Sequence, residues 1–359
     1  MFFELLYPLV PYFNALNVFQ YISFRGAYAA LTALLICYVL GPIIIEKLHR
    51  LKVDQSIRED GPETHLKKGG TPTMGGILII FSVVIAMLLW QDLKNDMVWL
   101  TIIAFVALGF IGFMDDYLKV VKHNSDGLPA WGKLVGQFVV ATGVVLYIYF
   151  TGGEDTTALY IPFIRDPVLD MGVLWIPFGI LLIMGESNAV NFSDGLDGLA
   201  TGLLLLVFIT LAGITYLSGR ADFSAYLGIP FIRGSGELTV FCLAAMGACV
   251  GFLWFNAHPA EVFMGDVGSL PLGGVVAVIS LLVKKEILML IIGGVFVLEI
   301  ASVIIQVVFF KWKKRRIFKM APLHHHFELS GWHESKVVIR FWILGGLFSI
   351  IALSTLKIQ

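Results

Sequence analysis

Long apolar stretches alternate with short polar segments along almost the whole chain. An α-helix needs about 20 apolar residues to cross the hydrocarbon core of a bilayer. The pattern therefore predicts an all-α integral membrane protein with ten transmembrane helices, in which residues 1–359 form a single polytopic domain. The expected spans are residues 22–45, 73–91, 97–114, 132–151, 172–190, 198–217, 237–257, 267–283, 287–310 and 338–357.

The composition agrees with a membrane protein and excludes an ordinary water-soluble domain. Hydrophobic residues make up 58% of the chain and charged residues only 14%, whereas a soluble domain carries roughly a quarter charged residues. Residues 1–21 are apolar but lack the basic start of a signal peptide, so we expect an interfacial helix there. Residues 152–171 predict a short hairpin, and the three cysteines predict apolar packing sites.

The distribution of Lys and Arg predicts the orientation. The loops 46–72 and 311–337 hold most of the cations, and loops rich in Lys and Arg stay in the cytoplasm. With an even number of spans, both termini lie on the other side. The loops 115–131, 191–197 and 258–266 then also face the cytoplasm.

Four polar clusters interrupt the apolar pattern, and all of them fall on this predicted cytoplasmic face. Removing carboxylates and imidazoles from water costs several kcal/mol for each group unless a metal, a partner or a polar substrate replaces the water. The sequence therefore predicts an active-site cleft at the cytoplasmic surface of the membrane. The clusters are Asp115–Asp116, Asn191–Asp197, Phe263–Asp266 and His324–His326.

The acidic residues suit a divalent cation, although each has a simpler explanation. Asp115 and Asp116 are adjacent and repel each other, and Lys119 lies one helical turn further on. The alternative is a solvated, acidic helix end. Asp266 precedes a span, where it is either an N-cap or a ligand for Mg²⁺, which prefers carboxylate oxygens. Asp194 likewise either caps a helix or faces a shared cavity.

Further polar residues leave the choice between structure and chemistry open. Glu299 lies inside an apolar span, where we favour a hydrogen bond between helices over a catalytic role. Gln306 is close enough to the cytoplasmic end to reach the site. Three consecutive histidines cannot point in one direction, so contacts with phosphate or sugar oxygens fit better than a zinc site.

These parts together indicate phosphoryl transfer to a lipid. Carboxylates bind Mg²⁺, lysines and histidines offset phosphate charge, and the membrane supplies the acceptor. No nucleic-acid partner is expected.

Five motifs resemble those of the phospho-N-acetylmuramoyl-pentapeptide transferases, within the polyprenyl-phosphate N-acetylhexosamine-1-phosphate transferase superfamily. They occur in order along nearly the whole chain, and they are Thr71–Gly76, Asp115–Tyr117, Asn188–Gly198, Phe263–Ser269 and Ala321–His326. The resemblance implies ten transmembrane helices with a bent ninth helix, and a Mg²⁺-dependent cytoplasmic cleft in a homodimer of the bacterial inner (plasma) membrane. It also implies transfer of phospho-MurNAc-pentapeptide from UDP-MurNAc-pentapeptide to undecaprenyl phosphate, which gives UMP and lipid I.

The resemblance also implies roles for single residues. Asp266 resembles the Mg²⁺ ligand, and Asp115 and Asp116 resemble the pair that handles the lipid phosphate. The residues that resemble the nucleotide side are Lys68, Asn191, Asp194, Gly195, Asp197, Asn256 and Phe263. The residues that resemble further cleft positions are Thr73, Lys119, Lys133, Gln306, His324, His325 and His326.

Some positions depart from the family pattern, and two other functions remain open. The departures are Glu261, Glu186–Ser187 and Trp332–Glu334; none of them removes a motif acid. One alternative is transfer of GlcNAc-1-phosphate from UDP-GlcNAc to the same lipid. The other is a transporter or lipid flippase, which would place its ionisable groups near the middle of the membrane.

Overall fold

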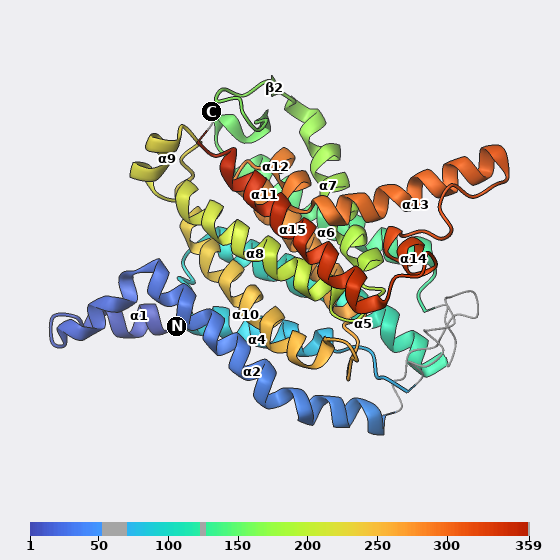
Figure 1. Cartoon of the computed structure of the whole chain (residues 1–359). Helices are drawn as coiled ribbons and strands as arrows, with labels where there is room; N and C mark the ends of the chain where they lie inside the picture. The colour runs from blue at the N-terminus through green and yellow to red at the C-terminus, as the bar shows by residue number, and fades with distance from the viewer. Residues whose placement is uncertain (52–69, 123–126, 358–359) are drawn as a thin grey trace.

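The structure, a computed structural model, describes residues 1–51, 70–122 and 127–357. Its long helices lie side by side in one bundle (Figure 1). Eight helices in these ranges are long and apolar enough to cross a membrane, so the chain is an all-α integral membrane protein. They are α2 (Ile22–Arg50), α5 (Asp96–Lys122), α6 (Ala130–Thr151), α7 (Trp175–Ser193), α8 (Leu199–Ser218), α10 (Leu238–Asn256), α13 (Gly294–Lys313) and α15 (Glu334–Ser354).

Two further apolar helices, of 10 to 17 residues, are shorter than these eight. They are α4 (Gly76–Trp90), with 15 residues, and α11 (Asp266–Leu282), with 17 residues. Every residue of α11 is buried, and α11 packs closely against α5 and α7. The apolar character of α11 therefore reflects a central place in the bundle, and the number of ten spans stays a prediction.

The ninth expected span is interrupted. A single helix over residues 287–310 was predicted, but α12 (Glu286–Ile292) ends at Gly293 and α13 begins at Gly294. A Cβ atom on Gly293 would lie 2.8 Å from Oε1 of Glu186. The break thus occurs where consecutive glycines allow the backbone to change direction, as the resemblance implied.

The first twenty residues do not form the single helix that was expected. They form α1 (Phe2–Leu6), η1 (Tyr7–Leu9) and η2 (Asn14–Gln20). Pro8 and Pro11, which lack the backbone N–H of an α-helical hydrogen bond, lie within this segment. The expected hairpin is present, with β1 (Ala158–Leu159) antiparallel to β2 (Leu169–Asp170). The remaining short elements are η3 (Glu154–Thr157), η4 (Gly172–Leu174), α9 (Ala221–Leu227), η5 (Ser235–Glu237) and α14 (Leu323–Glu328).

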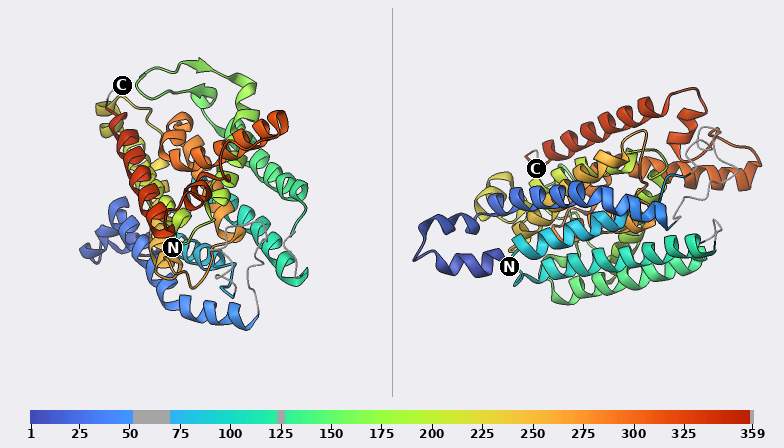
Figure 2. Two further views of the ribbon diagram at one scale, coloured as in Figure 1. Left: turned by 45° about the vertical axis from the view of Figure 1, so that its right-hand side comes forward. Right: turned by 90° about the horizontal axis from the view of Figure 1, so that it is seen from below.

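Both termini lie at one end of the bundle (Figure 2). The amino group of Met1 donates to the carbonyl of Leu88 near the end of α4, and Lys357 donates to the carbonyl of Tyr226 in α9. Because successive helices alternate in direction, the loops after α7, α10 and α13 all reach the opposite end. We call this opposite end the site end.

Candidate active site

Three carboxylates converge at the site end. Asp115 and Asp116 come from α5, and Asp266 is the first residue of α11. They offer oxygen atoms that lie within 4.8 Å of one another, and all three residues are buried. We call these residues the acid cluster. The pair on α5 does not end a helix, since α5 continues for about two turns to Lys122.

Glycines allow the acid cluster to form. A Cβ atom on Gly112 of α5 would lie 2.1 Å from the carbonyl oxygen of Asp266, which no real contact permits. A Cβ atom on Gly265, whose φ is 71°, would lie 2.6 Å from Oδ2 of Asp116 and 2.8 Å from Oγ1 of Thr73. The backbone before α11 therefore passes directly beside Asp116 and Thr73.

Two lysines balance part of the negative charge. Nζ of Lys119 lies 2.6 Å from Asp115, 3.2 Å from Asp116 and 3.5 Å from Asp266. Lys133 reaches across from α6 to form an ion pair with Asp266 and lies 3.9 Å from Asp115. The expected pairing of Asp115 with Lys119 is thus confirmed, and two cations face three carboxylates.

Neutral donors hold the remaining carboxylate oxygens. Nδ2 of Asn191 donates to Oδ1 of Asp266 at 2.6 Å. The backbone N–H of Val267 donates to Oδ2 of Asp116 at 3.1 Å, and that of Leu128 donates to Oδ1 of Asp115 at 2.9 Å. These bonds come from three different segments, so the orientation of each carboxylate is fixed before any ligand binds.

Asp194, in the loop between α7 and α8, adds a fourth acidic group. Loss of contact with water raises the pKa of its carboxyl well above the usual range, and the negative charges of Asp266 and Asp116 raise it further. A hydrogen bond from Gly265 lowers it in part, and Asp197 also contributes to the rise. Asp194 therefore lies within electrostatic reach of both the acid cluster and Asp197.

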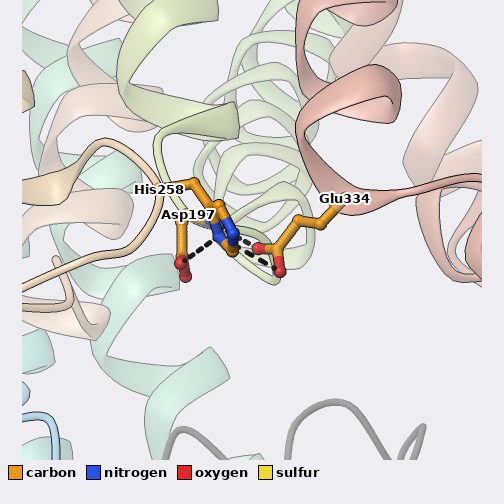
Figure 3. Close-up of side chains that lie close together, drawn as sticks. All are labelled: Asp197, His258 and Glu334. Carbon is orange, nitrogen blue, oxygen red and sulfur yellow. Dashed lines mark hydrogen bonds and ion pairs between the residues drawn. The ribbon is translucent and has the colours of Figure 1, made fainter.

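Asp197 belongs to a second cluster, with His258 and Glu334 (Figure 3). Nδ1 of His258 lies 3.0 Å from Oδ2 of Asp197 and 3.6 Å from Oε2 of Glu334. The sequence did not single out His258 or Glu334 as site residues. The available signal was their position, because each lies in a polar segment that begins or ends a predicted span.

Other expected nucleotide residues brace the same loops. Asn256, at the end of α10, donates to the carbonyl of Val262 at 2.9 Å and accepts from the hydroxyl of Thr201 at 2.7 Å. The backbone N–H of Phe263 donates to the carbonyl of Pro72 at 2.8 Å. Lys68 lies outside the described residues.

The three histidines have different hydrogen-bond and charge partners, although the rings of His324 and His325 also meet, with centroids 4.1 Å apart. His324 is fully buried, and its backbone N–H donates to Glu299 at 3.2 Å while its Nδ1 lies 3.3 Å from the same carboxylate. A Cβ atom on Gly195 would lie 2.5 Å from Nε2 of His324. His325 contacts Glu328, and His326 accepts a hydrogen bond from the backbone of Lys319.

Gln306 holds the segment that follows α13. Its Oε1 accepts hydrogen bonds from the backbone N–H groups of Ile317 and Phe318, each at 3.0 Å, and its Nε2 donates to the carbonyl of Phe318. These hydrogen bonds stabilise the loop that leads to the histidines. A direct contact of Gln306 with the substrate stays a prediction.

Known proteins resemble this chain over its full length. Residues 97–284, which include the acid cluster, match the model of glycosyl transferase family 4. The phospho-N-acetylmuramoyl-pentapeptide-transferases of Thermodesulfovibrio yellowstonii and Desulfosudis oleivorans are 50% and 51% identical to it, with 100% of both chains covered. The chain belongs to the phospho-N-acetylmuramoyl-pentapeptide-transferase family. The enzyme of that name from Borreliella burgdorferi is 51% identical over 97% of this chain and 99% of its own.

Proposed function

We propose that this protein transfers phospho-MurNAc-pentapeptide from UDP-MurNAc-pentapeptide to undecaprenyl phosphate, with UMP and lipid I as products. The observation that carries the proposal is the convergence of Asp115, Asp116 and Asp266 with two lysines at one end of a membrane-spanning bundle. Such a site suits phosphate groups that must be reached from the membrane. The membership of a family with this printed activity supports the same substrates.

The acid cluster fits Mg²⁺, and we assign Asp266 as its protein ligand. Its donors are oxygen atoms of buried carboxylates, which hard divalent cations prefer, and Mg²⁺ commonly uses only one or two of them together with phosphate oxygens. When bound, the ion would offset the charge of the diphosphate and of the departing UMP. Lys119 and Lys133 would then be free to contact phosphate oxygens.

The residues of the chain support a single displacement. An oxygen of the lipid phosphate attacks the β-phosphorus, and the bond between that phosphorus and the bridging oxygen breaks as UMP leaves. The lipid phosphate is largely ionised near neutral pH, so Asp115 only orients it or accepts a remaining proton. Both oxygens of Asp116 already accept from Val267 and Lys119, which disfavours a covalent aspartyl intermediate. A phospho-aspartyl species trapped without lipid would overturn this mechanism.

We propose that the nucleotide binds beside the acid cluster, along the loops after α7 and α10. Asp194 links this region electrostatically to Asp197 and Asp266. The positive-inside rule supports a cytoplasmic site in the bacterial plasma membrane, and the family resemblance supports a homodimer. The proposed nucleotide-side residues are Lys68, Asn191, Asp194, Gly195, Asp197, Asn256 and Phe263. The proposed further cleft residues are Thr73, Lys119, Lys133, Gln306, His324, His325 and His326.

The decisive experiment is release of UMP by the purified protein with UDP-MurNAc-pentapeptide, undecaprenyl phosphate and Mg²⁺. Replacing the donor by UDP-GlcNAc tests the neighbouring branch of the superfamily, and we expect no release with it. UMP released only from UDP-GlcNAc, or no UMP from either donor, would overturn the proposal.

The variant Asp266→Asn tests the metal assignment. The amide has the same shape but carries no charge, so we expect turnover to fall by at least about 10³-fold at every Mg²⁺ concentration. Near-normal activity of this variant would remove Asp266 as the ligand while leaving the transfer reaction itself intact.

A further inference from the structure

Three segments that are far apart in the sequence meet at the cluster of Asp197, His258 and Glu334 (Figure 3). Asp197 lies in the loop between α7 and α8, His258 lies in the loop between α10 and α11, and Glu334 is the first residue of α15. Asp197 and Glu334 are buried, whereas the side chain of His258 is 34% exposed. The cluster therefore lies at the boundary between the bundle and its surface.

Hydrogen bonds fix the plane of the Asp197 carboxylate. Its Oδ2 faces Nδ1 of His258 at 3.0 Å and accepts from the backbone N–H of Ala260 at 3.2 Å. Because Nδ1 faces carboxylate oxygens of both Asp197 and Glu334, it is the nitrogen that carries the proton. The χ2 torsion of an aspartate is otherwise broad, so two donors on one oxygen also set the direction of the other oxygen.

Glu334 contacts both Asp197 and His258. Its Oε1 accepts the backbone N–H of Asp197 at 2.9 Å, and its Oε2 lies 3.6 Å from Nδ1 of His258. An acidic residue in the first turn of a helix usually stabilises that helix by interacting with its dipole. Here the carboxylate instead joins the start of α15 to the backbone N–H of Asp197 and to the imidazole that faces the Asp197 carboxylate.

We propose that His258 and Glu334 are positioning residues, which orient the Asp197 carboxylate toward the nucleotide part of the donor. The proposal rests on the function proposed above, in which Asp197 is a nucleotide-side residue. In that function the phosphates are bound at the acid cluster, which contains neither His258 nor Glu334. Loss of the positioning contacts therefore weakens binding of the nucleotide substrate and leaves the chemical step nearly unchanged.

The test compares kcat and KM for both substrates in variants of the full-length protein. His258→Ala removes the donor to Asp197. Glu334→Gln retains an acceptor for the backbone of Asp197 but places an amide donor toward Nδ1–H. We expect each to raise the KM for UDP-MurNAc-pentapeptide about 10-fold, the effect of losing one charge-assisted hydrogen bond. The kcat and the KM for undecaprenyl phosphate stay within about twofold.

Two matched variants separate positioning from packing. His258→Asn keeps an N–H donor at nearly the position of Nδ1 and should recover most of the affinity lost in His258→Ala. His333→Ala removes an exposed ring that meets His258 edge-on, with centroids 5.8 Å apart, and should leave both KM values unchanged. Melting temperatures in detergent identify variants that fail to fold, and only variants that melt close to the unmodified protein are compared.

The outcomes distinguish the two proposals. If the unmodified protein makes lipid I but His258→Asn is as impaired as His258→Ala, or if kcat falls while the KM for the nucleotide stays constant, the positioning role is wrong. If the unmodified protein makes no lipid I, the proposed function is wrong. Binding of UMP by calorimetry then tests positioning by itself, and equal affinity in the protein with and without His258→Ala would overturn it.

Discussion

Single charged side chains set the electrostatics of the acid cluster. Lys119 comes from the same helix as Asp115 and Asp116, whereas Lys133 comes from α6 and pairs with Asp266. The cluster therefore depends on one cation that local sequence supplies and on one that only the tertiary structure supplies. The second cation holds the residue that we assign to the metal.

The variant Lys133→Met tests the role of this second cation. It keeps most of the apolar stem and removes the charge, so a phosphate oxygen loses a cationic partner in a site with little water. We expect kcat/KM for UMP release to fall by about 10²-fold. The control is Lys94→Met, which changes an exposed lysine at the other end of the bundle. Activity within twofold of normal for Lys133→Met would contradict a catalytic contribution of this charge.

Sequence spacing predicts some of these contacts and not others. Asp115 and Lys119 are four residues apart, so helical geometry alone places them on one face. His258 and Asp197 are 61 residues apart, and Asp197 and Glu334 are 137 residues apart. Local periodicity carries no information about such pairs. Asn191 belongs to a polar cluster that the sequence itself shows, whereas Lys133 was expected only from the family resemblance, and the contacts of both with Asp266 required the structure.

At the scale of helices, apolar length predicts most elements closely. The span predicted at residues 198–217 forms α8 from Leu199 to Ser218. The apolar pattern by itself does not predict the break at Gly293, because it is uninterrupted there, and only the family resemblance implied a bend in this span. The pattern also ends the span of residues 97–114 before the charged last turns of α5, although the expected pairing of Asp115 with Lys119 requires that the helix continue. The contacts of Glu299 agree with the expected hydrogen bond between helices, because its carboxylate joins α13 to His324 at the start of α14.

The close contact between α5 and α11 leads to a prediction for Gly112→Ala. The added methyl group would lie 2.1 Å from the carbonyl oxygen of Asp266, so the helices must separate and the carboxylates with them. We expect a loss of about 1–3 kcal/mol of stability and at least about tenfold lower turnover. In α6, Gly143→Ala meets open space and should stabilise the protein by roughly 0.5–1 kcal/mol. Equal melting temperatures and activities for the two variants would contradict this account.

Adjacent lysines between α11 and α12 should respond to substitution in opposite ways. Lys284 donates to the buried carboxylate of Glu286 at 2.9 Å and to the carbonyl of Thr156 at 2.6 Å. Lys285 is buried at the N-terminus of α12, and burial lowers the pKa of its ammonium group to about 8. Lys284 therefore neutralises the buried carboxylate of Glu286, whereas burial makes the charged form of Lys285 unfavourable.

We therefore expect Lys284→Met to lower the melting temperature, because it leaves Glu286 without its cation, and Lys285→Met to raise it. The pKa of Lys285 in the folded protein, about 8, is below the unfolded value of about 10.4. The free energy of unfolding therefore decreases as the pH falls from about 10.4 through 8, because the unfolded chain then binds a proton that the buried amine binds less readily. The gain from Lys285→Met, about 1–3 kcal/mol, should be complete below pH 8 and decline toward pH 10.5. Thermal unfolding in detergent across this range measures both variants, and a gain that grows with pH would contradict the assignment.

At the scale of the whole molecule, the alternation of helix directions gathers the chemistry at one end. Met1 and Lys357 make their contacts near the ends of α4 and α9, while the acid cluster and α14 lie at the site end. The sequence predicted this separation because each polar cluster falls at a boundary of a span. Which end faces the cytoplasm is a separate matter that depends on the charges of the loops.

Labelling of single introduced cysteines decides the orientation. Ser330→Cys places a thiol in the exposed turn after α14, and Val168→Cys places one between β1 and β2 at the other end. The native thiols of Cys37, Cys242 and Cys249 are buried, so they contribute little background. With a maleimide that does not cross membranes, we expect cells with an opened outer envelope to label Val168→Cys at once. Ser330→Cys should react only after the plasma membrane is permeabilised, and its labelling in intact spheroplasts would place the acid cluster outside the cytoplasm, where a nucleotide donor is not supplied.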